Sequence, residues 1–426
     1  LEGKVGLREG LAAVAGTWVL ASLFGALPYC ISGVIPSFID AVFETTSGLT
    51  TTGASVLSDL ELLPKSILFW RSLTQWLGGM GIIVLFIVLL PNIGMGAVHL
   101  FNAEVSGPIS EKVLPKIKDT AKVLWTIYTG MTFLLAGLLY IAGMPLFDAV
   151  NHAFTTLATG GFSTRSASVA AYNSLAIELI IVIFMFFAAI NFNIFIHAWR
   201  HRTLRSFNNT EFRAYFLIAF ASFAIISFSL ILQQGTGVFS SMRQSVFQVI
   251  SIMTTTGYAT ADYDQWPGLA KMVLFFLMFI GGCAGSTAGG IKVSRLVLLF
   301  KMGWAQIKQA IHPHLVTTIS VHNRVVDHYI LNTVGKFFFL YMLTFSTASL
   351  LLAATGLEPF DAMAATIANL GVIGPGFGVV GPTLTYASIS SFGKIVLSLC
   401  MLLGRLELFT LLVFLQPAFW KFKKSW

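Results

Sequence analysis

The chain has 426 residues, of which 56% are apolar and 10% charged, and its net charge is +8. Soluble domains carry about 25% charged residues, so this composition excludes an ordinary water-soluble protein. A bilayer-spanning helix takes about 20 apolar residues, and at least eight runs of that length can be drawn. The basic residues gather in loops between the apolar runs and form no single patch, which argues against nucleic acid as a partner.

The first apolar run, residues 11–31, follows Lys4 and Arg8, and these two charges predict a cytoplasmic N-terminus. Residues 38–47 form an amphipathic segment that is too short to cross a bilayer, so we interpret it as a half-helix. A glycine-centred loop follows, and residues 66–90 return through the membrane. The glycines at 78–81 in this return run are typical of close helix packing.

The same unit then repeats three times along the chain. Outward runs occupy residues 124–141, 215–232 and 333–354, and half-helices begin near Phe147, Ser241 and Phe360. Return segments occupy residues 175–198, begin again near 269, and occupy 392–415. Basic stretches near 91–122, 200–213, 292–308 and 421–424 separate or end the units, which predicts cytoplasmic loops and a cytoplasmic C-terminus.

Four units in the same orientation imply a pseudo-fourfold axis along the membrane normal, a symmetry that membrane transporters use. We therefore predict an all-α membrane protein with four parallel helix–pore loop–helix repeats around a pseudo-fourfold central pore. The predicted repeats are residues 1–95, 96–205, 206–325 and 326–426.

The loops after the four half-helices share a central glycine. Aligning Asp40, Asp148 and Asp361, which we interpret as helix N-caps, brings three loop glycines into register, and a Thr-Gly-aromatic match adds the fourth. Glycine allows backbone conformations that turn carbonyl groups toward an axis, where they replace the water around a cation. The predicted K⁺-binding filter residues are Thr51, Thr52, Gly53, Thr159, Gly160, Gly161, Thr255, Thr256, Gly257, Val372, Ile373 and Gly374.

A half-helix that stops inside the membrane points its partially negative C-terminal end at the central cavity, which favours a cation. The loops contain no ring of acidic side chains, which argues against a filter for multivalent cations. Of the potassium-channel consensus Thr-Val-Gly-Tyr-Gly, only the central glycine occurs in all four loops, so we expect looser selectivity than in a potassium channel.

Several polar residues in apolar segments admit two interpretations. Glu44 in the first half-helix either pairs with a packing partner or biases the outer vestibule, and His152 in the second either packs or titrates. Asn191 and Asn193 lie in a predicted return helix, where they either join neighbouring helices or form part of a site. The cysteines Cys30, Cys283 and Cys400 are isolated and fit buried hydrophobic residues rather than metal ligands.

Arg405 lies inside the last apolar run, where an arginine costs at least ~2.5–3.5 kcal/mol and usually faces a cavity or a partner. A pore or gate position is one interpretation, and a pair with Glu407 is the other, although residues two apart on a helix do not face each other. Residues 281–290 hold too many glycines to remain helical, so we expect a mobile gate or a rigid kink. The predicted gate residues are Gly281, Gly282, Gly285, Ser286, Thr287, Gly289, Gly290 and Arg405.

Four stretches carry a family resemblance: residues 70–81, the Thr-Thr-Thr-Gly loops, residues 282–292 and residues 404–407. With these, the chain resembles the Trk/Ktr/HKT superfamily of potassium transporters, and within it the TrkH/TrkG type of membrane subunit, nearly from end to end. The resemblance implies a homodimer in the bacterial inner membrane, in contact with membrane lipid, with a K⁺ pore in each subunit. It also implies that Arg405 is a positive barrier beneath the filter and that residues 281–290 are the gating loop.

The same resemblance implies a cytoplasmic TrkA-like regulatory ring that binds NAD(H), ATP or ADP. Nucleotide is then expected only on that partner, and the chain itself carries no covalently bound cofactor. Members of this type usually have two further helices before the first repeat, so we expect that an N-terminal segment is missing from this sequence.

The leading hypothesis is a potassium uptake pore, and the alternative is a K⁺/Na⁺ symporter or a weakly selective cation transporter. In the family that the chain resembles, serine at the position of Gly53 is associated with sodium permeation, and this chain has glycine there. Passive flux and coupling to protons or sodium both remain open. An enzyme would need converging nucleophiles, bases or metal ligands at membrane depth, and the sequence shows no such cluster.

Overall fold

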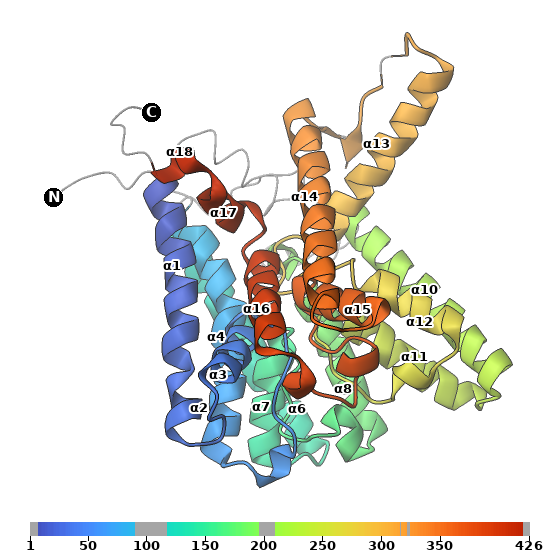
Figure 1. Cartoon of the computed structure of the whole chain (residues 1–426). Helices are drawn as coiled ribbons and strands as arrows, with labels where there is room; N and C mark the ends of the chain where they lie inside the picture. The colour runs from blue at the N-terminus through green and yellow to red at the C-terminus, as the bar shows by residue number, and fades with distance from the viewer. Residues whose placement is uncertain (1–6, 90–116, 196–208, 316, 322–323, 421–426) are drawn as a thin grey trace.

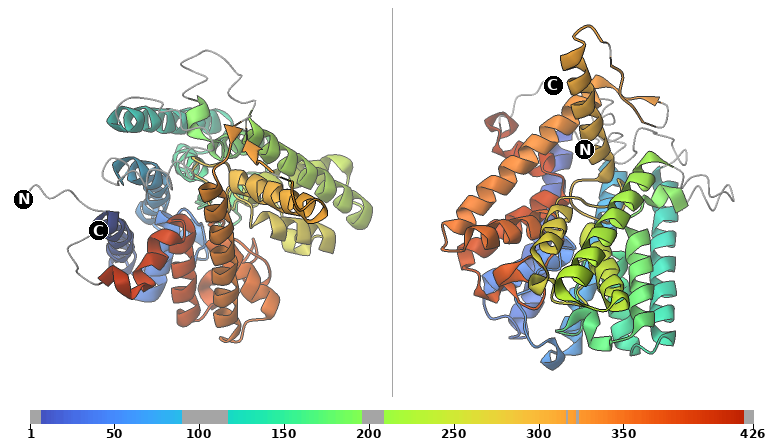
Figure 2. Two further views of the ribbon diagram at one scale, coloured as in Figure 1. Left: turned by 90° about the horizontal axis from the view of Figure 1, so that it is seen from above. Right: turned by 90° about the vertical axis from the view of Figure 1, so that its right-hand side faces the viewer.

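A computed structural model describes residues 7–89, 117–195, 209–315, 317–321 and 324–420. Its helices form an elongated bundle in which the four units follow one another around a common centre when seen from above (Figure 1; Figure 2, left). Apart from the paired two-residue strands β1 (Ser320–Val321) and β2 (Arg324–Val325), the regular structure of the described residues is helical. The prediction of an all-α architecture with parallel repeats is therefore confirmed.

Each unit has an outer helix, a half-helix and a return helix. The outer helices are α1 (Leu7–Gly25) continued by α2 (Leu27–Ile31), α6 (Ile117–Ile141), α10 (Thr210–Gln234) and α14 (His328–Ala353). The half-helices are α3 (Phe38–Leu49), α7 (Leu146–Leu157), α11 (Val238–Met253) and α15 (Pro359–Leu370). The return helices are α4 (Lys65–Leu89), α8 (Leu175–Ala188), α12 (Gly268–Leu277) with α13 (Val293–Ile311), and α16 (Ser391–Arg405).

Shorter elements complete the chain. The loops after the half-helices contain the 3₁₀ turns η1 (Leu60–Leu62), η2 (Ser168–Tyr172), η4 (Tyr263–Gln265), η5 (Gly378–Val380) and η6 (Tyr386–Ser388). After α16 come α17 (Phe409–Leu412), η7 (Val413–Leu415) and α18 (Pro417–Trp420). The unit boundaries predicted at 95 and 205, and most of the basic stretches predicted to be cytoplasmic near 91–122, 200–213 and 421–424, lie outside the described residues.

The half-helices are short for a physical reason. Three of them have 12 residues, which corresponds to about 18 Å of helix against a hydrocarbon core of about 30 Å, so each ends inside the membrane. Their last two turns are almost wholly buried among the surrounding helices. The loops that follow are consequently held at the centre of the bundle.

The described residues contain fewer membrane-spanning helices than the eight or more apolar runs drawn from the sequence. Four helices there are long and apolar enough to cross a membrane, and a fifth is added if the bent pair Ser391–Arg405 and Phe409–Leu415 counts as one span. That pair bends by 114°, so the predicted continuous return over 392–415 is wrong. The third return is also divided, since α12 and α13 are separated by the glycine-rich segment.

The predicted return helix over 175–198 also ends early, because α8 stops at Ala188. Asn191 follows the break, and its side-chain oxygen accepts a hydrogen bond from the backbone N–H of Asn193 at 2.9 Å. Asn191 therefore lies in a break of the predicted helix, whereas Asn193 lies in the helical residues 192–195 that follow it. The asparagine side chain competes with helical hydrogen bonds, which is why such a break occurs at this residue.

The aspartates that aligned the repeats were predicted to be N-caps, and this prediction is wrong. They lie in the first turn of their helices. The N-cap positions belong to Ser37, Pro145 and Glu358. The aspartates instead bind partners outside their own helices. Asp40 accepts from Lys394 Nζ at 2.7 Å, Asp148 from Arg165 Nη2 at 3.0 Å, and Asp361 from the N–H of Val379 at 3.4 Å.

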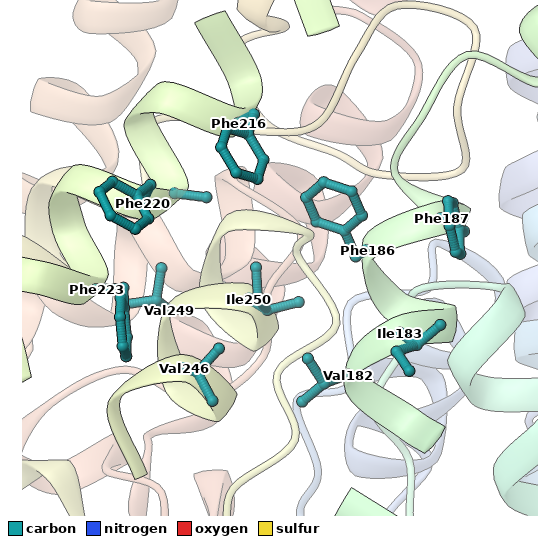
Figure 3. Close-up of a pocket in the computed structure, with 11 residues that line it drawn as sticks. Val182, Ile183, Phe186, Phe187, Phe216, Phe220, Phe223, Val246, Val249 and Ile250 are labelled. Atoms are coloured by element: carbon teal, nitrogen blue, oxygen red, sulfur yellow. The ribbon is translucent and has the colours of Figure 1, made fainter. Parts of the chain in front are cut away.

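The packing between units is largely hydrocarbon. Between α8, α10 and α11 it leaves a cavity of about 390 Å³, and Figure 3 shows its wall of valine, isoleucine and phenylalanine side chains. At the centre of the bundle, by contrast, threonine side chains are fully buried, among them Thr51, Thr52, Thr255 and Thr256. Buried polar groups of this kind mark the centre as the place where function is to be sought.

Candidate cation filter and gate

All four half-helices end in the same backbone motif. In the first, Thr51 N–H donates to Gly48 O at 3.0 Å and Thr52 N–H donates to Ser47 O at 2.8 Å, which are the two bonds of a Schellman motif. The second bond, which joins residues five apart in the chain, recurs in the other loops as Gly160 N–H to Thr155 O (2.8 Å), Thr256 N–H to Ser251 O (2.9 Å) and Ile373 N–H to Ala368 O (2.8 Å). The repeats are therefore equivalent at the level of single hydrogen bonds.

The motif places β-branched residues in the left-handed region, where glycine is usual. The φ angles are 58° at Thr51, 53° at Thr159, 57° at Thr255 and 61° at Val372. Each such residue costs about 1–2 kcal/mol, and strain of this kind collects at functional sites. Two residues later, the loop glycines are again left-handed, with φ between 77° at Gly161 and 97° at Gly374.

These four glycines lie against the backbone of the neighbouring loop. A Cβ atom added at any of them would come closer than 3.0 Å to a carbonyl oxygen of the next loop. The pairs are Gly53 with Gly160 O, Gly161 with Thr256 O, Gly257 with Ile373 O, and Gly374 with Thr52 O. The loops thus touch in cyclic order and close a ring. A cavity of about 290 Å³, lined in part by Gly53, Gly161, Gly257 and Pro375, opens onto it.

The ring presents backbone oxygens and threonine hydroxyls. Among the described residues, no group of three or more His, Cys, Asp or Glu side chains could hold a metal ion. Backbone oxygens that replace hydration water suit a monovalent cation. The helix ends that meet at the ring add their negative dipole ends to the same effect.

The glycine-rich segment 281–290 is not helical, as its composition predicted, and it packs under the ring. Thr287 Oγ1 donates to Leu157 O (3.1 Å) at the end of α7 and to Ala188 O (3.2 Å) at the end of α8. Gly289 N–H donates to Thr255 Oγ1 at 2.7 Å. The segment therefore supplies donors to the carbonyls that the early end of α8 leaves unpaired, and it contacts a strained residue of the third loop.

Arg405 joins this segment to the first unit. Its Nη1 donates to Thr287 O at 2.6 Å and its Nη2 donates to Gly78 O at 3.0 Å. The alternative pair with Glu407 is wrong, because Glu407 forms an ion pair with Arg295. Arg405 is 3% exposed, so its charge is buried with carbonyl oxygens as its partners.

The remaining candidates have packing contacts. His152 is hydrogen-bonded through Nδ1 to Asp148 O (2.8 Å) and through Nε2 to Ser163 Oγ (3.1 Å). Glu44 pairs with Arg71 at 2.8 Å. A Cβ added at Gly78 would collide with the backbone of Leu49, so the glycines of α4 allow close helix packing, as predicted.

Three buried residues close to the ring or the segment were assigned no role from the sequence: Arg71, Gln75 and Glu211. Gln75 contacts the second loop, and Glu211 Oε1 accepts from the N–H groups of Ala284 (2.7 Å) and Ser294 (3.1 Å). Arg71 and Gln75 are polar residues within an apolar run, which is the signal that singled out Arg405.

A family model described as a cation transport protein, TrkH, matches residues 2–422. The chain belongs to the TrkH family. This is a family of transport proteins and not of enzymes. The fold agrees with that of the crystal structure of the potassium transporter TrkH from Vibrio parahaemolyticus, with a TM-score of 0.88 and 40% identity over 97% of this chain and 86% of that one.

Relatives in the TrkH family share much of the sequence. The Trk system potassium uptake protein TrkH of Escherichia coli strain K12 is 42% identical over 99% of this chain and 87% of its own length. The corresponding figures for TrkH of Salmonella typhimurium are 41%, 99% and 87%. TrkG of Escherichia coli strain K12 is 34% identical over 97% of this chain and 86% of its own length.

We expect Arg405→Ala to raise basal cation flux about tenfold or more, because it removes two hydrogen bonds from a charged donor and the buried charge itself. Such bonds contribute about 1.5–3 kcal/mol each, and about 1.4 kcal/mol corresponds to a factor of ten. Flux into proteoliposomes measures the effect. Arg405→Lys keeps the positive charge but cannot reach both carbonyls, so it separates the effect of the charge from the effect of the two hydrogen bonds. A folded Arg405→Ala protein with wild-type flux would make Arg405 purely structural.

Proposed function

We propose that this chain is the membrane subunit of a potassium uptake system in the bacterial inner membrane. The observation that carries the proposal is the closed ring of four equivalent loops, in which each glycine lies against a carbonyl of the next loop. Its relatives are named as Trk system potassium uptake proteins, which supports K⁺ as the ion. K⁺ enters from the side of the 290 Å³ cavity and exchanges its water for oxygens of the loops.

In this mechanism, residues 281–290 are the gate. The segment occupies the space under the third loop, and its hydrogen bonds to α7, α8 and Thr255 keep it there. Arg405 holds the segment through Thr287 and sets a positive charge beside the cation path. In a medium of low dielectric constant that charge is screened little, so the closed state resists cations both sterically and electrostatically.

The regulator in this proposal is a cytoplasmic TrkA-like ring that binds NAD(H), ATP or ADP. The basic residues Lys292, at the N-cap of α13, and Arg295, in its first turn, directly follow the gate segment and would transmit a pull from the ring. The subunit works as a homodimer with one pore in each protomer, and both ends of this chain face the cytoplasm. The relatives' description as parts of a Trk system supports a multi-component assembly.

The second candidate is a K⁺/Na⁺ symporter or a weakly selective cation transporter. It is favoured by the residues that precede the ring glycines, which are Thr52, Gly160, Thr256 and Ile373. Three different residue types at one level of the ring contrast with the identical subunits of a potassium channel. Uptake of K⁺ against Na⁺ into proteoliposomes, with the pH gradient set and then abolished, distinguishes the two candidates and tests for coupling.

We expect Gly53→Ser to lower the K⁺-over-Na⁺ permeability ratio about tenfold. Gly53 has a φ of 85°, and a side chain there meets Gly160 O, so one quarter of the ring must shift. Bi-ionic potentials of the purified variant give the ratio. Gly143→Ser is a matched control for the backbone strain alone, because Gly143 also has a positive φ, 96°, and a Cβ there would meet no other atom. A Gly53→Ser variant with the wild-type ratio would contradict the filter assignment.

We expect deletion of residues 284–288 to give high K⁺ flux that no longer responds to the cytoplasmic ring or its nucleotides. The deletion removes Thr287 and, with it, the bonds to α7, α8 and Arg405. Thr287→Val, which keeps the backbone carbonyl and loses only the hydroxyl, should show a smaller rise. A folded deletion variant that stays closed until the ring opens it would place the gate elsewhere.

A further inference from the structure

A buried ion pair lies behind the first two loops of the ring. Arg71 Nε donates to Glu44 Oε1 at 2.8 Å, and the two side chains are 2% and 0% exposed. Among the ion pairs of the described residues this one is the most deeply buried. Because removing two charges from water costs several kcal/mol each, such a pair is retained only where its geometry satisfies further hydrogen bonds.

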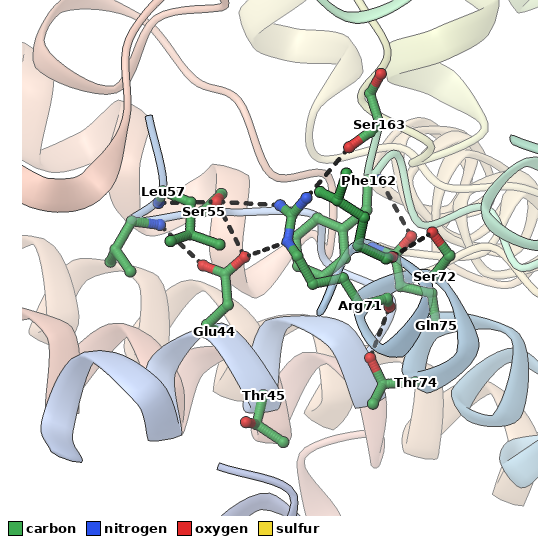
Figure 4. A network of polar contacts seen from close by, with 12 residues as sticks. Glu44, Thr45, Ser55, Leu57, Arg71, Ser72, Thr74, Gln75, Phe162 and Ser163 are labelled. Carbon is green, nitrogen blue, oxygen red and sulfur yellow. Dashed lines mark hydrogen bonds and ion pairs between the residues drawn. The ribbon is translucent and has the colours of Figure 1, made fainter. Parts of the chain in front are cut away.

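Arg71 satisfies that condition by binding both loops (Figure 4). Its Nη2 donates to Ser55 Oγ at 3.1 Å in the first loop, and its Nη1 donates to Ser163 O at 3.2 Å in the second. Its guanidinium group also lies over the ring of Phe162, 4.1 Å from the centroid. The planar fork of arginine suits three directions at once, which an ammonium group does not.

Glu44 fixes the first loop from the other side of the pair. Its Oε1 accepts from Ser55 Oγ at 3.0 Å and its Oε2 accepts from the N–H of Val56 at 2.9 Å. Ser55 and Ser163 each stand two residues after a ring glycine. The hydroxyl contact belongs to the first loop alone, because Ser163 accepts from Arg71 through its backbone carbonyl. The equivalent residues of the third and fourth loops, Ala259 and Gly376, have no hydroxyl group.

Gln75, one turn further along α4, holds the second loop at the ring itself. Its Nε2 donates to Gly160 O at 2.6 Å and its Oε1 accepts from the N–H of Phe162 at 3.1 Å. Gly160 O is the atom that a Cβ at Gly53 would strike, so the amide of Gln75 fixes the carbonyl at the contact between loops one and two.

The contact between the fourth and first loops is held by neutral groups. Tyr386 N–H donates to Ser55 O at 2.9 Å, and its hydroxyl donates to Gly374 O at 2.6 Å. One face of α4 therefore supports the contact between the first and second loops with a fully buried ion pair and an amide group.

We propose that Arg71 and Gln75 are specificity-determining positioning residues, which set the separation of the first two loops and thereby the preference for K⁺ over Na⁺. This inference rests on the proposed function. A ring of carbonyls discriminates between ions only if their number and spacing are held against relaxation around the smaller ion. The charged fork and the amide of α4 supply that resistance at the contact between Gly53 and Gly160.

The test compares the K⁺-over-Na⁺ permeability ratio of purified variants in proteoliposomes. Gln75→Leu frees Gly160 O and Phe162 N–H, and the double variant Glu44→Gln/Arg71→Met removes the pair without leaving a lone buried charge. Each is expected to lower the ratio about tenfold while K⁺ still permeates. Arg71→Lys keeps the charge and loses the fork, and it is expected to lower the ratio as well.

The matched control is Glu178→Gln/Arg243→Met, which removes a bidentate pair of 2.7 and 2.8 Å between α8 and the start of α11. It is expected to keep the wild-type ratio. Gln75→Asn, which is too short to reach both backbone groups, replaces Gln75→Leu if that variant does not fold.

Three results would overturn the proposal. Unchanged ratios in the folded double variant and the Gln75 variant would show that the loops keep their separation without Arg71 and Gln75. A wild-type ratio in Arg71→Lys, with a lowered ratio in the double variant, would mean that the charge alone matters. A wild-type protein that carries no K⁺ would overturn the proposed function together with this inference, whereas a selective wild type with unchanged variants overturns this inference alone.

Discussion

The contact between each ring glycine and a carbonyl of the next loop is the constraint on which the rest of the structure depends. Without a side chain at Gly53, Gly161, Gly257 or Gly374, four backbones can meet around one axis. That meeting requires half-helices that stop inside the membrane, long helices that surround them, and hydrogen bonds for every polar group that lies at membrane depth. The Schellman motif at the end of each half-helix meets the last requirement for the helix ends.

The fourfold pattern of the backbone is supported by side chains that are not fourfold. Arg71 and Gln75 of α4 hold the first two loops, whereas Tyr386 holds the fourth. Beneath the ring, residues 281–290 come from the third unit alone and donate to a carbonyl that the short helix α8 leaves unpaired. A single chain with four unequal repeats can thus combine a nearly symmetric ring with an asymmetric segment beneath it, which four identical subunits cannot do.

Much of this organisation was predictable from the sequence. The order of elements in each unit, the positions of the half-helices and the register of the four glycines follow from apolar periodicity and a repeated loop. The break in residues 281–290 follows from the cost of glycine in a helix. The prediction was wrong at the end of α8 and at the bend after Arg405. The first break is marked in the sequence only by Asn191, and the second lies in an apolar run whose composition gives no sign of it.

The sequence by itself thus determined that this is an all-α membrane protein with four parallel repeats and one glycine-rich interruption, because hydrophobicity and glycine content act locally along the chain. Only the tertiary structure decided which side chains meet. It paired Glu407 with Arg295 and left Arg405 to two carbonyls, and it turned the presumed caps Asp40 and Asp148 toward Lys394 and Arg165. A buried charge needs a partner within hydrogen-bond distance, and packing decides which groups come that close. Except for Asp148 with Arg165, the partners named here belong to different repeats.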